Sequence, residues 1–162
     1  MSTLLLAMTM ILGMIGGAPT PGSSPSHAAQ SPLQTAEITV GGVPLTVELA
    51  YLPADRSLGL SYREELAPGT GMLFLFEEPA PRSFWMRGMQ FCIDIVWIEN
   101  SVIQGAVESV CPEPAGATGA DLTSYVSPVP VTYVLEVPAG WLDAYGLGPG
   151  TLVEGLPSLV MR

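Results

Sequence analysis

Four ionic side chains stand in otherwise apolar blocks of the sequence, where each charge needs either a protein partner or a ligand. They are Arg63, Arg82, Arg87 and Asp94. Together they could line a pocket that grips a carboxylate or a similar anion, with Asp94 orienting one guanidinium. Alternatively, Asp94 caps a loop or pairs with an arginine so that both groups can be partly buried. We favour the structural interpretation and keep Arg63, Trp85, Arg87 and Asp94 as ligand-binding candidates.

Aromatic side chains form a second candidate surface, because their faces suit the apolar faces of sugar rings. Trp85 and Trp97, however, lie inside apolar runs of strand length, and we expect both in the core. The full aromatic set is Trp85, Trp97, Trp141, Tyr125 and Tyr133.

Two missing residue types exclude most catalytic constellations. The only histidine, His27, lies in the predicted leader, and lysine is absent. A chain that begins after the leader therefore has no Ser-His-Asp triad, Cys-His pair, histidine-ligated metal or lysine nucleophile. A carboxylate pair for glycoside hydrolysis stays open, but Glu64-Glu65 and Glu77-Glu78 adjoin predicted turns, where acids are usually solvated. We assign no catalytic residue and expect no metal or cofactor.

The charge balance narrows the class of partner. Fifteen acidic residues against five arginines give a formal net charge of −10. So negative a surface repels phosphate backbones and anionic membranes, so we expect neither nucleic-acid binding nor stable membrane insertion once the leader is removed. The same charge favours a monomer. The expected partner is a small ligand of unknown identity or a component of the cell envelope.

The N-terminus resembles an export signal. Leu4 to Ile15 form a nearly continuous apolar run, too short for the ~20 residues that span a bilayer but typical of a signal peptide. Ser26-His27-Ala28 follows as a cleavage site, although no Lys or Arg precedes the run, and an uncleaved anchor is the alternative. We predict a signal peptide at 1–28, a disordered linker at 29–34, a single domain at 35–162, and a periplasmic or extracellular location.

Cys92 and Cys111 are the only cysteines, and export favours a disulfide between them. They flank a predicted hairpin whose register depends on its turn. A four-residue loop, Asn100–Ile103, places the cysteines directly opposite each other, whereas a two-residue turn, Asn100-Ser101, displaces them by two positions. Two buried thiols are the alternative, and a catalytic thiol lacks a histidine to activate it.

Hydrophobic periodicity and turn residues indicate a mainly β (α+β) protein. We expect a compact barrel-like or sandwich domain of antiparallel strands with one or two short helices. The helical segments are expected within 53–63 and after 138–140. The predicted strands are 35–40, 43–49, 71–76, 83–86, 93–98, 102–110, 131–137 and 151–156, with a long loop at 112–123.

A set of sequence blocks from residue 37 to residue 156 resembles the DUF192 family, a domain of unknown function. The blocks are Leu58-Gly59-Leu60 with Arg63, Gly71-Met72-Leu73-Phe74 with Phe76, Phe84-Trp85-Met86-Arg87, Asp94-Ile95, Tyr125 with Ser127, and Tyr133-Val134-Leu135-Glu136-Val137-Pro138-Ala139-Gly140. The resemblance implies a small, mainly β domain that is often exported and has no assigned activity. The chain departs from the family pattern at Gly88-Met89 and at Gln90–Ile93, which lowers the expectation that a ligand of relatives carries over.

Two functions from different classes follow. The first is a non-enzymatic binding or accessory module of the cell envelope. The second is an extracytoplasmic hydrolase that uses a carboxylate pair. Two carboxyls facing across a cleft at a separation of about 5–10 Å would favour the hydrolase, because glycoside hydrolysis needs that spacing.

Overall fold

A computed structural model describes residues 32–114, 116–117 and 119–158. The predicted signal peptide at 1–28 and the first residues of the predicted linker lie outside this part of the chain. Within the described residues, no helix is long and apolar enough to span a membrane. The strands are β1 (Thr35–Val40), β2 (Val43–Ala50), β3 (Thr70–Ala80), β4 (Ser83–Phe84), β5 (Ile93–Glu99), β6 (Val102–Val110), β7 (Tyr125–Val126), β8 (Val131–Pro138) and β9 (Val153–Glu154). The helical segments are α1 (Pro53–Leu58), a 3-10 turn η1 (Gly119–Asp121) and α2 (Trp141–Tyr145).

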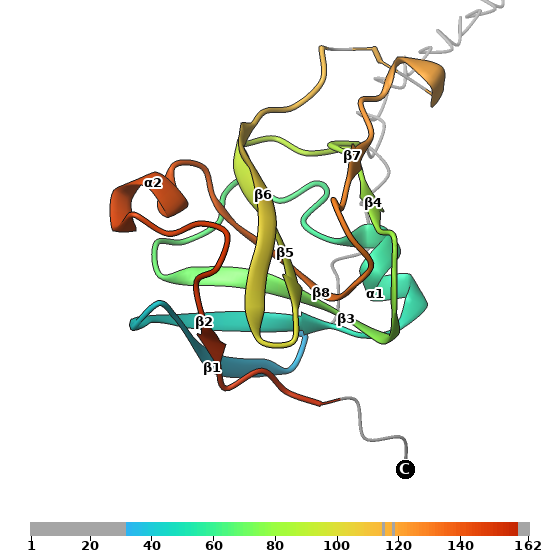
Figure 1. The fold of residues 1–162 in the computed structure, drawn as a ribbon. Helices are drawn as coiled ribbons and strands as arrows, with labels where there is room; N and C mark the ends of the chain where they lie inside the picture. Colours follow the sequence, from blue (N-terminus) through green and yellow to red (C-terminus); the bar gives the residue numbers. More distant parts are fainter. Residues whose placement is uncertain (1–31, 115, 118, 159–162) are drawn as a thin grey trace, which may run out of the picture. The chain divides into compact units, whose positions relative to one another are not determined.

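Seven strands form one curled sheet in the order β6-β5-β8-β3-β2-β1-β9, which makes a half-barrel (Figure 1). The short strands β4 and β7 pair separately. The prediction of a mainly β, barrel-like domain with two short α-helices is therefore confirmed. One pair differs from the antiparallel expectation, because β2 and β3 run parallel. The connection between them, which contains α1, is long enough to cross from one end of the sheet to the other.

The central sheet is buried on both faces. Alternate residues of β3 point to opposite sides, so Leu73 and Leu75 join the core beneath α2, whereas Met72 and Phe74 join a second core on the side of α1. The same alternation on β8 places Leu135 on the α2 side. Residues on both faces of the central strands are therefore removed from water.

Strand β3 extends further than predicted. We expected it to end at Phe76, because two glutamates and Pro79 follow, but it continues to Ala80. The register against β8 shifts between Leu75 and Ala80, so that Phe76–Pro79 face a single residue, Thr132. Pro79 has no backbone N–H to donate, and it is tolerated here because the regular hydrogen-bond ladder is interrupted in this stretch.

The final strand is shorter than the predicted 151–156, and only Val153–Glu154 pair with β1. The predicted loop at 112–123 is followed by a strand that sequence reasoning missed, β7, which pairs with β4. Both strands are two residues long, so neither has enough residues for a periodic pattern to show.

The predicted disulfide joins Cys92 and Cys111. The turn between β5 and β6 is the two-residue form, with Glu99 opposite Val102. Two register shifts, next to Trp97 and next to Ile95, each add one residue to β6, so that Ile93 comes to face Val110. Two β-bulges, and not a four-residue loop, therefore align the cysteines.

Asp94 holds the second bulge in place. Its side chain is fully buried, and its carboxylate accepts hydrogen bonds from three backbone N–H groups. Oδ1 accepts from Ser109 at 2.8 Å and Gly140 at 3.1 Å, and Oδ2 accepts from Leu142 at 3.1 Å. Asp94 thus ties the bulged strand β6 to the start of α2, as a cap and not as the partner of an arginine.

Replacing Asp94 should destabilise the domain strongly. Asp94→Ala leaves three N–H groups without their acceptor, and each loss in a buried setting costs about 1 kcal/mol or more. We expect the free energy of unfolding to fall by at least about 3 kcal/mol in urea denaturation. Asp143→Ala, an exposed aspartate of α2, is the matched control and should change it by less than about 1 kcal/mol. Equal losses in the two variants would contradict this account of Asp94.

Candidate functional site

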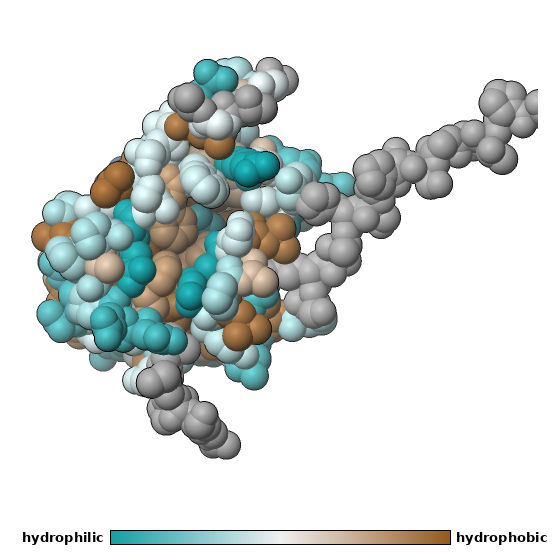
Figure 2. Space-filling view, turned by 90° about the vertical axis from the view of Figure 1, so that its right-hand side faces the viewer, coloured by the Kyte–Doolittle hydropathy of each residue, from teal (hydrophilic) through white to brown (hydrophobic). Residues whose placement is uncertain are grey.

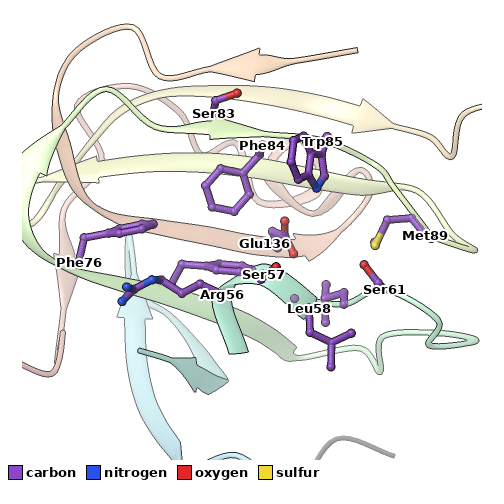
Figure 3. Close-up of a pocket in the computed structure, with 13 residues that line it drawn as sticks. Arg56, Ser57, Leu58, Ser61, Phe76, Ser83, Phe84, Trp85, Met89 and Glu136 are labelled. Carbon is purple, nitrogen blue, oxygen red and sulfur yellow. The ribbon is translucent and has the colours of Figure 1, made fainter. Parts of the chain in front are cut away.

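A cavity of about 270 Å³ lies among α1, the loop that follows it, β4 and the central strands β3 and β8 (Figure 3). Four aromatic side chains line it, Phe74 and Phe76 from β3, Phe84 from β4 and Trp85 directly after β4. Figure 2 shows hydrophobic residues on the floor of a hollow on the side that carries α1 and β4, with hydrophilic residues along its edges. The cavity is near the lower end of the usual size for small-molecule sites, whose walls are also mainly apolar.

The residues at the ends of α1 shape one wall. Pro53 occupies the first turn, where its missing N–H costs no helical bond, and Gly59 ends the helix with a positive φ of 52°. A Cβ at Gly59 would lie 3.3 Å from the ring of Phe74, so glycine lets the chain pass close to β3. The hydroxyls of Ser57 and Ser61 therefore reach the side of the cavity opposite β4 (Figure 3).

One carboxyl group, that of Glu136 on β8, lies inside this apolar site. Its neighbours in register are Met72 on β3 and Ile95 on β5, so the carboxyl stands between two apolar side chains on the same face of the sheet. Figure 3 shows it between Ser57 on one side and Phe84 on the other. Only 5% of Glu136 is exposed, and its Oε2 has no hydrogen-bond partner among the described residues.

Burial raises the pKa of Glu136 to about 8, because the surrounding apolar side chains disfavour the charged form. The positive charge of Arg63 opposes this shift but does not cancel it. Arg63 is held by Glu48, to which it donates two hydrogen bonds of 2.6 and 2.8 Å. This bond, more than any other influence, raises the pKa of Arg63. At neutral pH the carboxyl of Glu136 is therefore largely protonated.

Two further arginines pack against Phe76 at the edge of the cavity. The guanidinium carbon of Arg82 lies 3.7 Å from the ring centroid and that of Arg56 lies 5.0 Å from it. Arg56 donates to the backbone carbonyls of Tyr51 and Leu75, and in Figure 3 its guanidinium points away from the interior of the cavity. Desolvation, followed by the charge of Arg56, lowers the pKa of Arg82. Both arginines are thus committed to the protein's own backbone and to Phe76.

The four predicted ligand-binding residues do not come together. Arg63 is bound to Glu48, Asp94 caps backbone groups near α2, and neither lines the cavity. Arg87 is exposed and lines a separate hollow with Glu113. Of the four, Trp85 alone lines the aromatic cavity.

Trp85 and Glu136 are the two residues on which the sequence interpretation and the structure differ most. Trp97 is buried as expected, but 56% of Trp85 is exposed at the cavity, so its assignment to the core is wrong. The strand predicted at 83–86 stops at Phe84, so Trp85 lies outside a strand. Glu136 was missed as a site residue, although an acid inside the apolar run 131–137 was a detectable signal.

The described part of the chain contains no group of three or more His, Cys, Asp or Glu side chains arranged to hold a metal ion. The chemistry of the cavity is therefore that of one buried carboxyl, several aromatic rings and the hydroxyls of Ser57, Ser61 and Ser83.

The raised pKa of Glu136 should make the domain less stable as the pH rises. An unfolded glutamate titrates near pH 4.5 and the folded protein near pH 8, so the folded state binds more protons between these values. Relative to Glu136→Gln, the free energy of unfolding should be highest below about pH 4.5 and decrease towards pH 8 by up to ~1.4 kcal/mol per pH unit. Urea unfolding of both proteins between pH 4 and pH 9 measures this difference. Parallel pH profiles would show that Glu136 titrates normally.

Comparisons with known proteins agree with the fold and with the blocks described above. A crystal structure of a proposed transcription regulator from Sinorhizobium meliloti is similar, with 32% sequence identity and a TM-score of 0.70 over 78% of this chain and 97% of that one. A protein of unknown function from Novosphingobium aromaticivorans is also similar, with 29% identity and a TM-score of 0.66 over 85% of this chain and 94% of that one. Among curated proteins, none matches the chain.

The family model that matches covers most of the chain. It is the DUF192 model, described as an uncharacterized ACR, and it aligns with residues 36–155. This range includes the cavity, Glu136 and both cysteines. The chain belongs to the DUF192 family.

Proposed function

We propose that the domain is a non-enzymatic binding module that takes a small, partly apolar ligand into the aromatic cavity, where a polar group of the ligand bonds to Glu136. The observation that carries this proposal is the buried Oε2 of Glu136, which has no hydrogen-bond partner in the part of the chain that the structure describes. Buried polar atoms are nearly always bonded, because leaving one without a partner costs about 1–3 kcal/mol. Because Glu136 lines the cavity, a ligand that contacts its carboxyl can supply the missing bond.

The alternative, an extracytoplasmic hydrolase with a carboxylate pair, finds no support in the cavity. Among its lining residues Glu136 is the single carboxyl, whereas glycoside hydrolysis uses two. The serines of the lining, Ser57, Ser61 and Ser83, have neither a histidine nor a lysine beside them in the lining. Binding without turnover is the function that this set of groups favours.

A screen by thermal shift tests the binding module. A ligand at a hundred times its Kd adds about 2.7 kcal/mol to the free energy of unfolding, so a binder in a library of small amines, alcohols, carboxylates and oligosaccharides should raise the Tm. Trp85→Ala, which opens one wall, should weaken binding about tenfold or more. Tyr145→Ala removes an aromatic residue of nearly the same exposure outside the cavity and should leave binding unchanged. No shift with any compound, or the same shift in Glu136→Leu, would contradict the proposal.

We also propose that the module acts outside the cytoplasm, in the cell envelope. The apolar run at Leu4 to Ile15 and the Cys92–Cys111 disulfide support export, because disulfides persist in oxidising compartments. The full chain expressed in a bacterial host should therefore be recovered from the periplasm or medium with Ala29 as its first residue. Denatured without reductant, it should show no free thiol with Ellman's reagent. Cytoplasmic protein with two free thiols would overturn the assignment, and an intact N-terminus on the membrane would indicate a retained anchor.

A further inference from the structure

We infer that the ligand of this cavity is an organic cation, with a protonated amine that meets Glu136 and an apolar body that lies among the aromatic rings. The inference rests on the proposed binding function and names the chemical class of its ligand. Three features of the cavity lead to it: its carboxyl, its walls, and the engagement of the arginines around it.

The first feature is the carboxyl itself. Oε2 of Glu136 has no hydrogen-bond partner among the described residues, and once the carboxyl has lost its proton an ammonium group can supply up to three N–H donors together with a compensating charge. A charge-assisted bond of this kind is roughly twice as strong as one between neutral groups. An anionic ligand would instead be repelled by Glu136 whenever that group ionises.

The second feature is the arrangement of the walls. Phe84 packs edge-to-face against Phe74, with ring centroids 4.9 Å apart and an interplanar angle of 89°. Trp85 adds a further ring and Met89 adds a polarizable sulfur, whereas Arg82 and Arg56 already stack on Phe76. The electron-rich faces of aromatic rings attract cations within about 6 Å, most strongly where water is excluded. Such walls also accommodate the hydrocarbon part of an amine.

The third feature is the surrounding charge. Arg63, which follows α1, is held by Glu48 of β2, and Arg56 of α1 points away from the interior and bonds to backbone carbonyls. Strands β3 and β4 contribute only apolar and hydroxyl side chains to the lining, and Asp94 of β5 faces the opposite side of the sheet. The positive charge of Arg63 acts on Glu136 from outside the lining, but no cationic side chain of the described residues donates a hydrogen bond to Oε2, so the carboxyl can pair with a ligand's cation.

Binding of a cation should be linked to the loss of a proton. Without a ligand Glu136 is a carboxylic acid at neutral pH, and a bound amine favours the carboxylate, so one proton leaves to solvent as the ion pair forms. The affinity for an amine should therefore rise about tenfold per pH unit up to roughly pH 8 and then level off, as long as the amine itself stays protonated. A neutral ligand that accepts a bond from the protonated carboxyl would behave differently. Its affinity would be constant below about pH 8 and would fall above it, as the carboxyl loses its proton.

Titration calorimetry with phenethylamine and 2-phenylethanol tests the inference, because the two probes share a body and differ in charge. We expect the amine to bind at least about tenfold more tightly at pH 7.5, with an affinity that rises between pH 6 and pH 8. Glu136→Gln should remove both the preference and the pH dependence. Glu154→Gln, an exposed glutamate of β9, removes the same charge elsewhere and should preserve both.

A second variant covers the case in which Glu136→Gln does not fold. Phe84→Leu keeps the wall apolar but removes the aromatic face, so it should weaken binding of the amine more than binding of the alcohol. Equal binding of the two probes, or tighter binding of the alcohol, would overturn the cationic class while leaving the binding module intact. Failure of both probes and of the whole library would overturn the binding module itself.

Discussion

The fold depends on one buried carboxylate, Asp94, and the three backbone N–H groups that it binds. The bond to Ser109 stabilises the bulge that brings β6 into register with β5 at the disulfide, and the bonds to Gly140 and Leu142 fix the start of α2. α2 has no side-chain cap of its own, so a residue from a distant strand performs this task. The carboxylate of Asp94 therefore fixes where the apolar residues of α2 pack on the sheet.

A second buried acid, Glu136, lies on the neighbouring strand and differs in almost every respect. Asp94 and Glu136 belong to adjacent paired strands, β5 and β8, but point to opposite faces of the sheet. Backbone donors surround the first, whereas apolar and aromatic side chains surround the second, which raises its pKa to about 8. A protein gains nothing in stability from an unsatisfied carboxyl in its interior, because a similarly shaped apolar side chain would avoid the cost of burying it. This contrast is the physical reason why Asp94 is described as a structural residue and Glu136 is proposed to bind a ligand.

The arginines around the cavity bond to other groups of the protein. Arg63 completes a bidentate ion pair with Glu48, and Arg56 and Arg82 stack on Phe76 while bonding to backbone carbonyls. This use of the guanidinium groups accounts for the irregular part of β3, whose carbonyls at Leu75 and Glu78 receive bonds outside the ladder. Of the two interpretations weighed from the sequence, the structural one fits Arg63 and Arg82, and the single carboxyl among the residues that line the cavity is that of Glu136.

The sequence by itself determined the mainly β class, the family and the net negative charge, because alternation, ordered blocks and composition are properties of the chain itself. It left the cysteines as either a disulfide or two buried thiols, and the two β-bulges that align them come from the fold. Only the tertiary structure decided which acid is satisfied. Asp94 and Glu136 both stand in apolar runs, and nothing in their immediate neighbours separates them. Their difference arises from elements distant in the chain, since α2 brings N–H donors to Asp94 while α1 and β4 bring a serine and aromatic rings to Glu136. Whether a buried charge has a partner depends on what the fold places opposite it, and that information is not local.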